Sequence, residues 1–295
     1  MILVTGAGGK TGRAVIRALM VSGQAVRALV HRPEQIDGLK EIGAKGVLVG
    51  DMHLGSTMES ACQGIRAVYH ICPNVNPDEV AIGQNIIRAA RLARVEHVVY
   101  HSVLHPQTEA MPHHWLKMRV EELLFESGLD FTILQPCAYM QNVLAYWQRI
   151  VSDGVYPVPY PVETRLSMVD LEDVAAAAAI TLTKPGHVGV IYELAGPEAL
   201  SQTEVAQVLG QQLGRPVRLE VVPLEVWENK ARASGMDDYA VETLIKMFRY
   251  YANYGLWGNP NVLGWLLGHP PHTFTDFVLR KINERSTDSK GSISK

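Results

Sequence analysis

The sequence has few cysteines, no long apolar run and no block of basic residues, and each absence excludes a class of protein. Its three cysteines, Cys62, Cys72 and Cys137, show no C-x-x-C spacing, and any single disulfide would leave one of them unpaired. A reduced chain in the cytoplasm is therefore expected. The longest apolar run, around Val174 to Ile180, falls far short of the roughly 20 residues that span a bilayer. The opening MILVTGAGG has no basic stretch, so no signal peptide is predicted.

The balance of charge gives no indication of a nucleic-acid surface. The chain has 27 Lys and Arg against 30 Asp and Glu, a formal net charge of -3, and its basic residues are dispersed. Its 295 residues, 47% of them hydrophobic, suit one large globular domain or a main domain with a smaller lobe. We expect a small-molecule substrate, no nucleic-acid or membrane partner, and a monomer or homodimer.

Short β-rich segments alternate with helical ones along the first half of the chain. Six strands are predicted, at residues 1–4, 25–30, 46–49, 67–71, 97–101 and 131–134. Helices are predicted between them, one opened by a capping box of Ser56 and Glu59, and others at 80–94 and about 113–127. Because parallel strands need long crossovers, this alternation predicts an α/β fold, a doubly wound parallel-sheet Rossmann domain.

The pattern becomes irregular after Tyr139, which indicates a second lobe. An alanine-rich helix is predicted at 171–182, a capping box of Ser201 and Glu204 opens a helix, and most of the remainder is helical. We therefore predict a smaller, mostly helical C-terminal lobe. The predicted boundaries are a Rossmann core at 1–152 completed by 165–195, a lobe at 153–164 and 196–286, and a disordered tail at 287–295.

A glycine-rich turn lies between the first predicted strand and the first predicted helix. Gly6, Gly9 and Gly12 form G-x-x-G-x-x-G, which permits a tight turn, close backbone approach to a diphosphate and close helix packing. The diphosphate would lie at the helix N-terminus, where free N–H groups favour negative charge. A nucleotide-hydrolysing P-loop is excluded, because its first glycine would fall on Val4.

The end of the second strand indicates which dinucleotide binds. NAD sites place an acid there for the ribose hydroxyls, whereas this chain has no acid and carries Arg32. Arg32 suits bidentate binding of the 2′-phosphate of NADP(H), with Lys10 or Arg13 assisting. The alternative is a solvated loop arginine.

The motifs VTGAGGKTGRAVIRAL, VRALVHRP, VGDM and GLDFTILQPCAYMQN together resemble the NmrA-like branch of atypical short-chain dehydrogenases/reductases. The stretch YGLWGNPNVLGWLLGHPPHTFTDF resembles the ending of a bacterial subset of that family. The resemblance covers nearly the whole chain up to about residue 285. It implies a Rossmann domain that binds NADP(H), with a small lobe closing over a substrate cleft.

The resemblance also implies roles for individual residues at the ends of the strands. The diphosphate contacts would come from Gly6, Gly9, Thr11 and Gly12. The family's usual arginine for the 2′-phosphate aligns with His31, one position before Arg32. The remaining cofactor contacts would be Asp51 and Met52 at the adenine, Ile71, Cys72 and Pro73 at the nicotinamide ribose, and Gln135, Pro136 and Cys137 at the nicotinamide.

The acid–base pair of the wider dehydrogenase family is incomplete in this sequence. That family uses Tyr-x-x-x-Lys, whereas this chain has His113 and Lys117, which share one helix face. Lys117 would bind the nicotinamide ribose, and His113 is either a proton donor or an ordinary residue at the start of a helix. Ser102 falls in the region of the family's catalytic serine.

A metal site is not expected, because the histidines at 101, 105, 113 and 114 have no cysteine or acid at a recognised ligand spacing. A cluster of mostly aromatic side chains follows Pro136 and suits an apolar, ring-shaped substrate, although core packing would also explain it. The predicted pocket residues are Tyr139, Met140, Asn142, Tyr146 and Tyr160.

Two functions remain open at this point. The first is an NADPH-dependent reductase of a small apolar or aromatic electron-poor acceptor, such as a quinone, enone or imine. The second is a redox sensor or regulator that binds NADP(H) without turnover and acts through a protein partner. The cofactor motif favours the first, and the missing tyrosine favours the second.

The assignment of Arg32 generates a direct test. We predict that Arg32→Ala weakens NADPH binding by about 1.5–3 kcal/mol, because a hydrogen bond to a charged group is lost. NADH lacks the 2′-phosphate, so its affinity should hardly change. Isothermal titration with both nucleotides measures this, and equal losses would contradict the assignment.

Overall fold

The computed structural model describes residues 1–291. The strands of its central sheet are β1 (Ile2–Val4), β2 (Val26–Val30), β3 (Gly46–Val49), β4 (Ala67–His70), β5 (His97–His101), β6 (Phe131–Pro136) and β10 (Val190–Leu194). They pair in the order β10-β6-β5-β4-β1-β2-β3, and every pairing in this sheet is parallel. The carboxyl ends of all seven strands therefore lie along one edge of the sheet.

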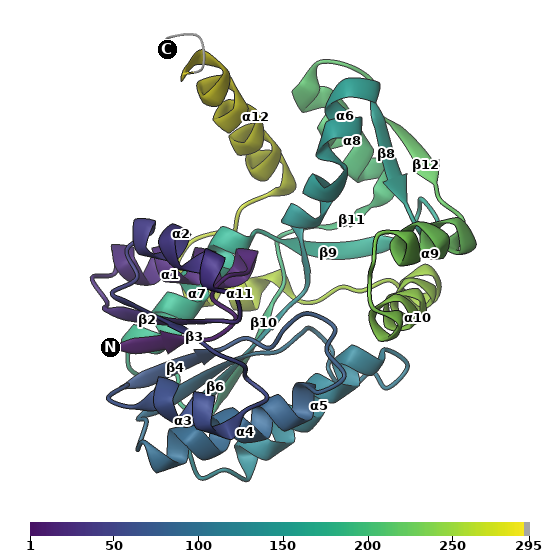
Figure 1. Cartoon of the computed structure of the whole chain (residues 1–295). Helices are drawn as coiled ribbons and strands as arrows, with labels where there is room; N and C mark the ends of the chain where they lie inside the picture. Colours follow the sequence, from purple (N-terminus) through teal and green to yellow (C-terminus); the bar gives the residue numbers. More distant parts are fainter. Residues whose placement is uncertain (292–295) are drawn as a thin grey trace.

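Helices cover both faces of this sheet (Figure 1). One face packs on α1 (Lys10–Val21), α2 (Ile36–Glu41), α7 (Leu171–Thr183) and α11 (Pro260–Leu267), and η1 (Pro33–Gln35) precedes α2. The other face packs on α3 (Gly55–Cys62), α4 (Glu79–Leu92) and α5 (Pro112–Phe125). Successive strand residues point to opposite faces, so Val99 on β5 lies in the first core and its neighbours Val98 and Tyr100 lie in the second.

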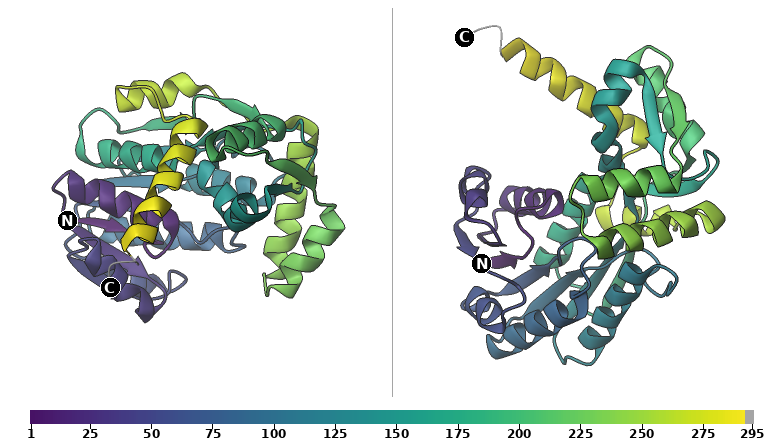
Figure 2. Two further views of the ribbon diagram at one scale, coloured as in Figure 1. Left: turned by 90° about the horizontal axis from the view of Figure 1, so that it is seen from above. Right: turned by 45° about the vertical axis from the view of Figure 1, so that its right-hand side comes forward.

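A second lobe follows β6 and stands above the carboxyl edge of the sheet (Figure 2). Its strands are β7 (Ala138–Tyr139), β8 (Val155–Val158), β9 (Arg165–Val169), β11 (Ala199–Ser201) and β12 (Arg218–Val221), which form a sheet β11-β9-β7 and a pair β12-β8. Its helices are η2 (Met140–Tyr146), α6 (Trp147–Asp153), α8 (Gln202–Leu213), α9 (Leu224–Ala233), α10 (Asp238–Tyr254) and α12 (Phe274–Gly291). Within residues 1–291, no helix combines the length and the apolarity needed to cross a membrane.

The structure confirms the predicted parallel sheet with helices on both faces and a C-terminal region rich in helices. All six predicted strands are present, and the predicted helix at 171–182 is α7. The capping box at α8 is confirmed: the Glu204 N–H donates to Ser201 Oγ (3.2 Å), and the Ser201 N–H donates to Glu204 Oε2 (2.7 Å).

Three local features differ from the sequence predictions. Helix α3 begins at Gly55 with Leu54 as its N-cap, so Ser56 lies inside the first turn and the predicted capping box is wrong. Strand β10 was not predicted, because its half-exposed residues at the sheet edge lack the buried pattern of the other strands. Helix α12 continues to Gly291, so the predicted disorder at 287–291 is wrong, and 292–295 lie outside the described residues.

Close packing between α1 and the preceding loop depends on Gly12. A Cβ at this position would lie 2.6 Å from both Ala7 Cα and Gly6 O, and backbone atoms cannot move aside cheaply. We predict that Gly12→Ala lowers the free energy of unfolding by about 1–3 kcal/mol, the usual cost of overpacking. Urea denaturation measures this loss.

Gly55→Ala is the matched control, since the only neighbour of its new Cβ is Asn85 Oδ1 at 3.8 Å. Its stability should be unchanged or slightly raised, because alanine is the better helix former. Equal stability of the two variants would contradict the packing argument.

Candidate functional site

The loop between β1 and α1 has one closed side and one open side. Gly6 has a φ of +57°, and a Cβ there would approach Ile71 O to 2.9 Å, so the loop is pressed against the segment after β4. Gly9 is the N-cap of α1, and a Cβ there would meet only Gly6 O, at 3.4 Å. No side chain of the described residues caps α1, so its first N–H groups have no partner within the helix. These amides can receive an anion over Gly9.

Thr5 fixes the segment after β4 beside this loop. Its hydroxyl accepts from the Ile71 N–H (2.8 Å) and donates to Ile71 O (3.0 Å). The predicted ribose contacts Ile71, Cys72 and Pro73 therefore begin directly beside the glycine loop. Sequence reasoning did not single out Thr5, although a threonine directly after the first strand is a visible signal.

The second strand ends in two exposed side chains, His31 and Arg32. The Arg32 backbone N–H donates to Gln35 Oε1 (3.3 Å), which starts the short helix η1. Arg13, the expected helper, has its guanidinium on Gly8 O and Gly38 O, both at 3.3 Å. Of these three candidates for the 2′-phosphate, Arg32 and His31 have exposed side chains, and the Arg13 guanidinium is held by backbone carbonyls.

An unpredicted bridge closes the predicted adenine end of the site. The His53 ring contacts Asp51 Oδ1 through Nδ1 (2.7 Å) and Asp78 Oδ2 through Nε2 (3.2 Å). The hydrogen bond to Asp51 is the main reason why the pKa of His53 is raised. Asn85 Nδ2 donates to Met52 O (3.1 Å) and His53 O (2.9 Å). The loop carrying Asp51 and Met52 is thereby tied to the start of α4.

Lys117 lies in a buried ion pair. Its Nζ is 2.9 Å from Glu79 Oε1 and 3.3 Å from His101 O, and only 14% of the lysine side chain and 3% of the glutamate are exposed. The Tyr100 hydroxyl donates to the same Glu79 oxygen (2.7 Å). Glu79 was not recognised from the sequence, because nothing local marks it as the partner of a lysine 38 positions away.

Ser102 and Gln135 share a second buried carboxylate. The Ser102 hydroxyl donates to Glu121 Oε1, and Gln135 Nε2 lies 2.9 and 3.0 Å from the two Glu121 oxygens. Burial is the main cause of a raised pKa at Glu121. The Ser102 hydroxyl is thus committed to a carboxylate and is not directed at an open cleft.

Burial keeps the side chains of His113 and Cys137 in their uncharged forms. Burial is the main reason why the pKa of His113 is lowered to about 2, and its Nδ1 has no hydrogen-bond partner among the described residues. The His113 ring is therefore uncharged at neutral pH. Burial likewise raises the pKa of the Cys137 thiol to about 12, so its reactive thiolate is not formed.

The five predicted pocket residues separate into two groups. Tyr139 and Asn142 lie beside the glycine loop: Lys10 Nζ is 5.3 Å from the centre of the Tyr139 ring and donates to Asn142 Oδ1 (3.0 Å). Met140, Tyr146 and Tyr160 pack instead in the hydrophobic core of the second lobe, where Met140 is 1% exposed.

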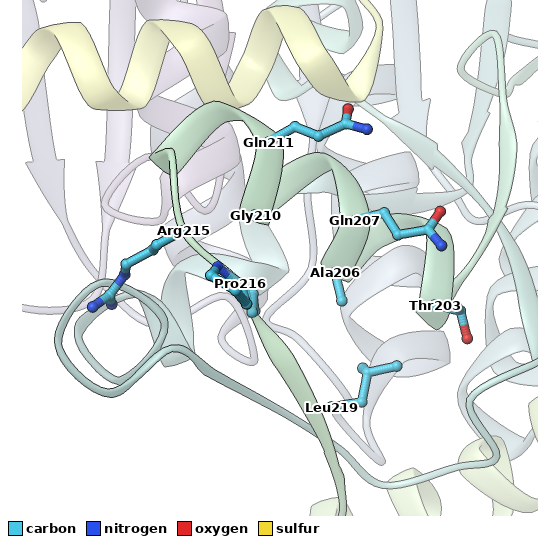
Figure 3. Close-up of a pocket in the computed structure, with 9 residues that line it drawn as sticks. Thr203, Ala206, Gln207, Gly210, Gln211, Arg215, Pro216 and Leu219 are labelled. Atoms are coloured by element: carbon cyan, nitrogen blue, oxygen red, sulfur yellow. The ribbon is translucent and has the colours of Figure 1, made fainter.

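Two surface grooves lie elsewhere on the protein. One, of about 480 Å³, runs between α8 and β12 and is lined by Gln207, Gln211 and Arg215 among others (Figure 3). The other, of about 580 Å³, lies between α4 and α5. Neither groove is lined by a residue predicted for the cofactor or substrate.

Comparison with known proteins shows the family to which the chain belongs. The model of the NmrA-like family matches residues 1–277. The chain belongs to the NmrA-like family. The NAD(P)H azoreductase of Xenophilus azovorans is 33% identical to this NmrA-like protein over 282 residues, which cover 94% of this chain and 96% of the relative. Quinone oxidoreductase 2 of Escherichia coli (strain K12) is 29% identical over 287 residues, 96% of this chain and 99% of the relative.

Solved structures agree with this relationship. The NADPH-dependent quinone oxidoreductase of Escherichia coli, complexed with NADPH, superposes with a TM-score of 0.83 at 28% identity, over 96% of this chain and 100% of that one. The triphenylmethane reductase of Citrobacter sp., complexed with NADP(H), gives 0.81 at 22% identity over 95% and 99%, which shows a shared fold. The NmrA-like protein thus has NAD(P)H-dependent oxidoreductases among its relatives.

The Lys117–Glu79 pair generates a stability test. We predict that Lys117→Met lowers the free energy of unfolding by about 3–5 kcal/mol, because it leaves the Glu79 charge buried without its cation. The double variant Glu79→Gln with Lys117→Met should recover most of that loss. Urea denaturation measures both, and a double variant no more stable than the single one would contradict the pairing.

Proposed function

We propose that this protein is an NADPH-dependent reductase of small apolar or aromatic electron-poor acceptors of the quinone, enone or imine type. The observation that carries the proposal is the uncapped N-terminus of α1 above Gly9, flanked by the side chains of Lys10 and Thr11. The azoreductase and quinone reductase relatives support the reaction class and add azo compounds to the acceptors worth testing.

The residues present fit a dinucleotide. A Cβ at Gly9 would meet only Gly6 O, at 3.4 Å, so the space beside the helix start is open, and the amides of the first turn have no other partner within the helix. Arg32 and His31 would hold the 2′-phosphate at the end of β2, and Lys117 would orient the nicotinamide ribose. The reduced nicotinamide supplies a hydride when bound, and the chain's own task is to place it beside the acceptor.

The site offers no free side-chain proton donor among Ser102, Lys117 and His113, which favours acceptors that can be reduced without general-acid catalysis. Ser102 is bound to Glu121, Lys117 is paired with Glu79, and His113 stays neutral. A quinone or similarly activated acceptor forms a stabilised anion on reduction, which takes its proton from water without a strong protein acid. The lack of a free proton donor would also suit the competing function, an NADP(H)-binding redox sensor that acts through a protein partner.

Turnover separates the two functions. We predict that the purified protein oxidises NADPH, followed by its absorbance, faster than blank with benzoquinone, a conjugated enone or an azo dye. Gly9→Val should abolish both NADPH binding and turnover, because its side chain fills the cradle while its φ of -77° suits valine. Circular dichroism verifies that this variant is folded.

NADPH binding without turnover on any of these acceptors would contradict the reductase and favour the sensor. Absence of NADPH binding to the folded wild-type protein would contradict both functions.

A further inference from the structure

A chain of three polar rings leads from the interior of the sheet to the glycine loop. The Tyr69 hydroxyl on β4 is 2.7 Å from His101 Nδ1 on β5, and His101 Nε2 is 2.6 Å from the Tyr139 hydroxyl on β7. Tyr69 is 0% exposed and His101 is 6% exposed. The sequence analysis predicted no functional role for Tyr69 or His101.

Burial determines how protons are distributed along this chain. It lowers the pKa of His101 to about 3, so the ring is neutral at physiological pH and carries a single N–H. Within residues 1–291, His101 Nδ1 is the only hydrogen-bond partner of the Tyr69 hydroxyl. If Nδ1 carried the proton, the buried Tyr69 O–H would have no acceptor, which is costly. Tyr69 therefore donates to Nδ1, and Nε2–H donates to Tyr139.

This arrangement leaves the Tyr139 hydroxyl hydrogen free to donate elsewhere. Lys10 is the first residue of α1, and its Nζ lies 5.3 Å from the centre of the Tyr139 ring and donates to Asn142 Oδ1 (3.0 Å). The Lys10 side chain thus places the start of α1 beside Tyr139, and an anionic oxygen bound at this helix N-terminus is a suitable acceptor for the free hydroxyl hydrogen.

We propose that Tyr139 donates a hydrogen bond to the diphosphate of the dinucleotide, and that Tyr69 and His101 position it by fixing the Nε2–H tautomer. This inference rests on the proposed function, since it needs a bound dinucleotide. It moves Tyr139 from the expected substrate pocket to the cofactor cradle. A hydrogen bond between a neutral hydroxyl and a charged phosphate oxygen is one of the stronger kinds in proteins.

Binding measurements with two ligands test the role of Tyr139. Tyr139→Phe should weaken NADPH binding about tenfold to a hundredfold, as expected for loss of a hydrogen bond to a charged group. Adenosine 2′-monophosphate lacks the diphosphate, so its affinity should not change. Tyr156→Phe is the matched control, because its buried hydroxyl donates to Gln202 Oε1 (3.1 Å) in the second lobe. Its NADPH affinity should equal that of the wild type.

Each other outcome overturns the inference. If wild-type protein binds NADPH and Tyr139→Phe binds it equally well, only the role of Tyr139 fails. If Tyr139→Phe instead lowers kcat at unchanged NADPH affinity, the tyrosine serves the substrate and not the diphosphate. If the wild type itself binds no NADPH, the proposed function fails as well.

The positioning role has a spectroscopic readout in the wild-type protein itself. Long-range proton–nitrogen NMR of histidine side chains, with His101 assigned by the peak missing in His101→Gln, should show the Nε2–H tautomer in the NADPH complex. Tyr69→Phe should let the Nδ1–H tautomer appear and should weaken NADPH binding by a smaller factor than Tyr139→Phe. A wild-type His101 in the Nδ1–H form would overturn this role.

Discussion

Close contact between the β1–α1 loop and its neighbours is the constraint on which the rest of the structure depends. Gly12 brings α1 against the loop, and Gly6 lets the same loop press on Ile71 after β4. Only a chain without side chains at these two points can bring the helix N-terminus to the carboxyl edge of the sheet. Thr5 then fixes the two strand ends to each other through both backbone groups of Ile71.

Strand β5 connects two polar networks on opposite faces of the sheet. Its alternation directs Tyr100 toward Glu79 and Lys117 on the α4–α5 side, and directs His101 toward Tyr69 and Tyr139 on the other side. Lys117 also donates to His101 O, which joins the two networks at the end of the strand. The carboxyl edge is therefore held by buried hydrogen bonds on both faces.

Local sequence signals predicted elements well where the signal and the structure lie in the same short segment. The strand–helix alternation and the Ser201 capping box are of this kind, and both are present. The Ser56 capping box failed, because the N-cap of α3 is Leu54, two residues before the serine that the side-chain pattern indicated. Strand β10 escaped notice, since an edge strand with half-exposed residues has no distinctive periodicity.

The sequence by itself determined the glycine loop, its place after the first strand, and the absence of an acid at the end of the second strand, because each depends on neighbouring residues. Only the tertiary structure decided that Lys117 is paired with Glu79, that Ser102 is held by Glu121 and that His113 is neutral. The chemistry of these side chains depends on burial and on partners from other elements. Neither burial nor such partners can be read from residues close by in the chain.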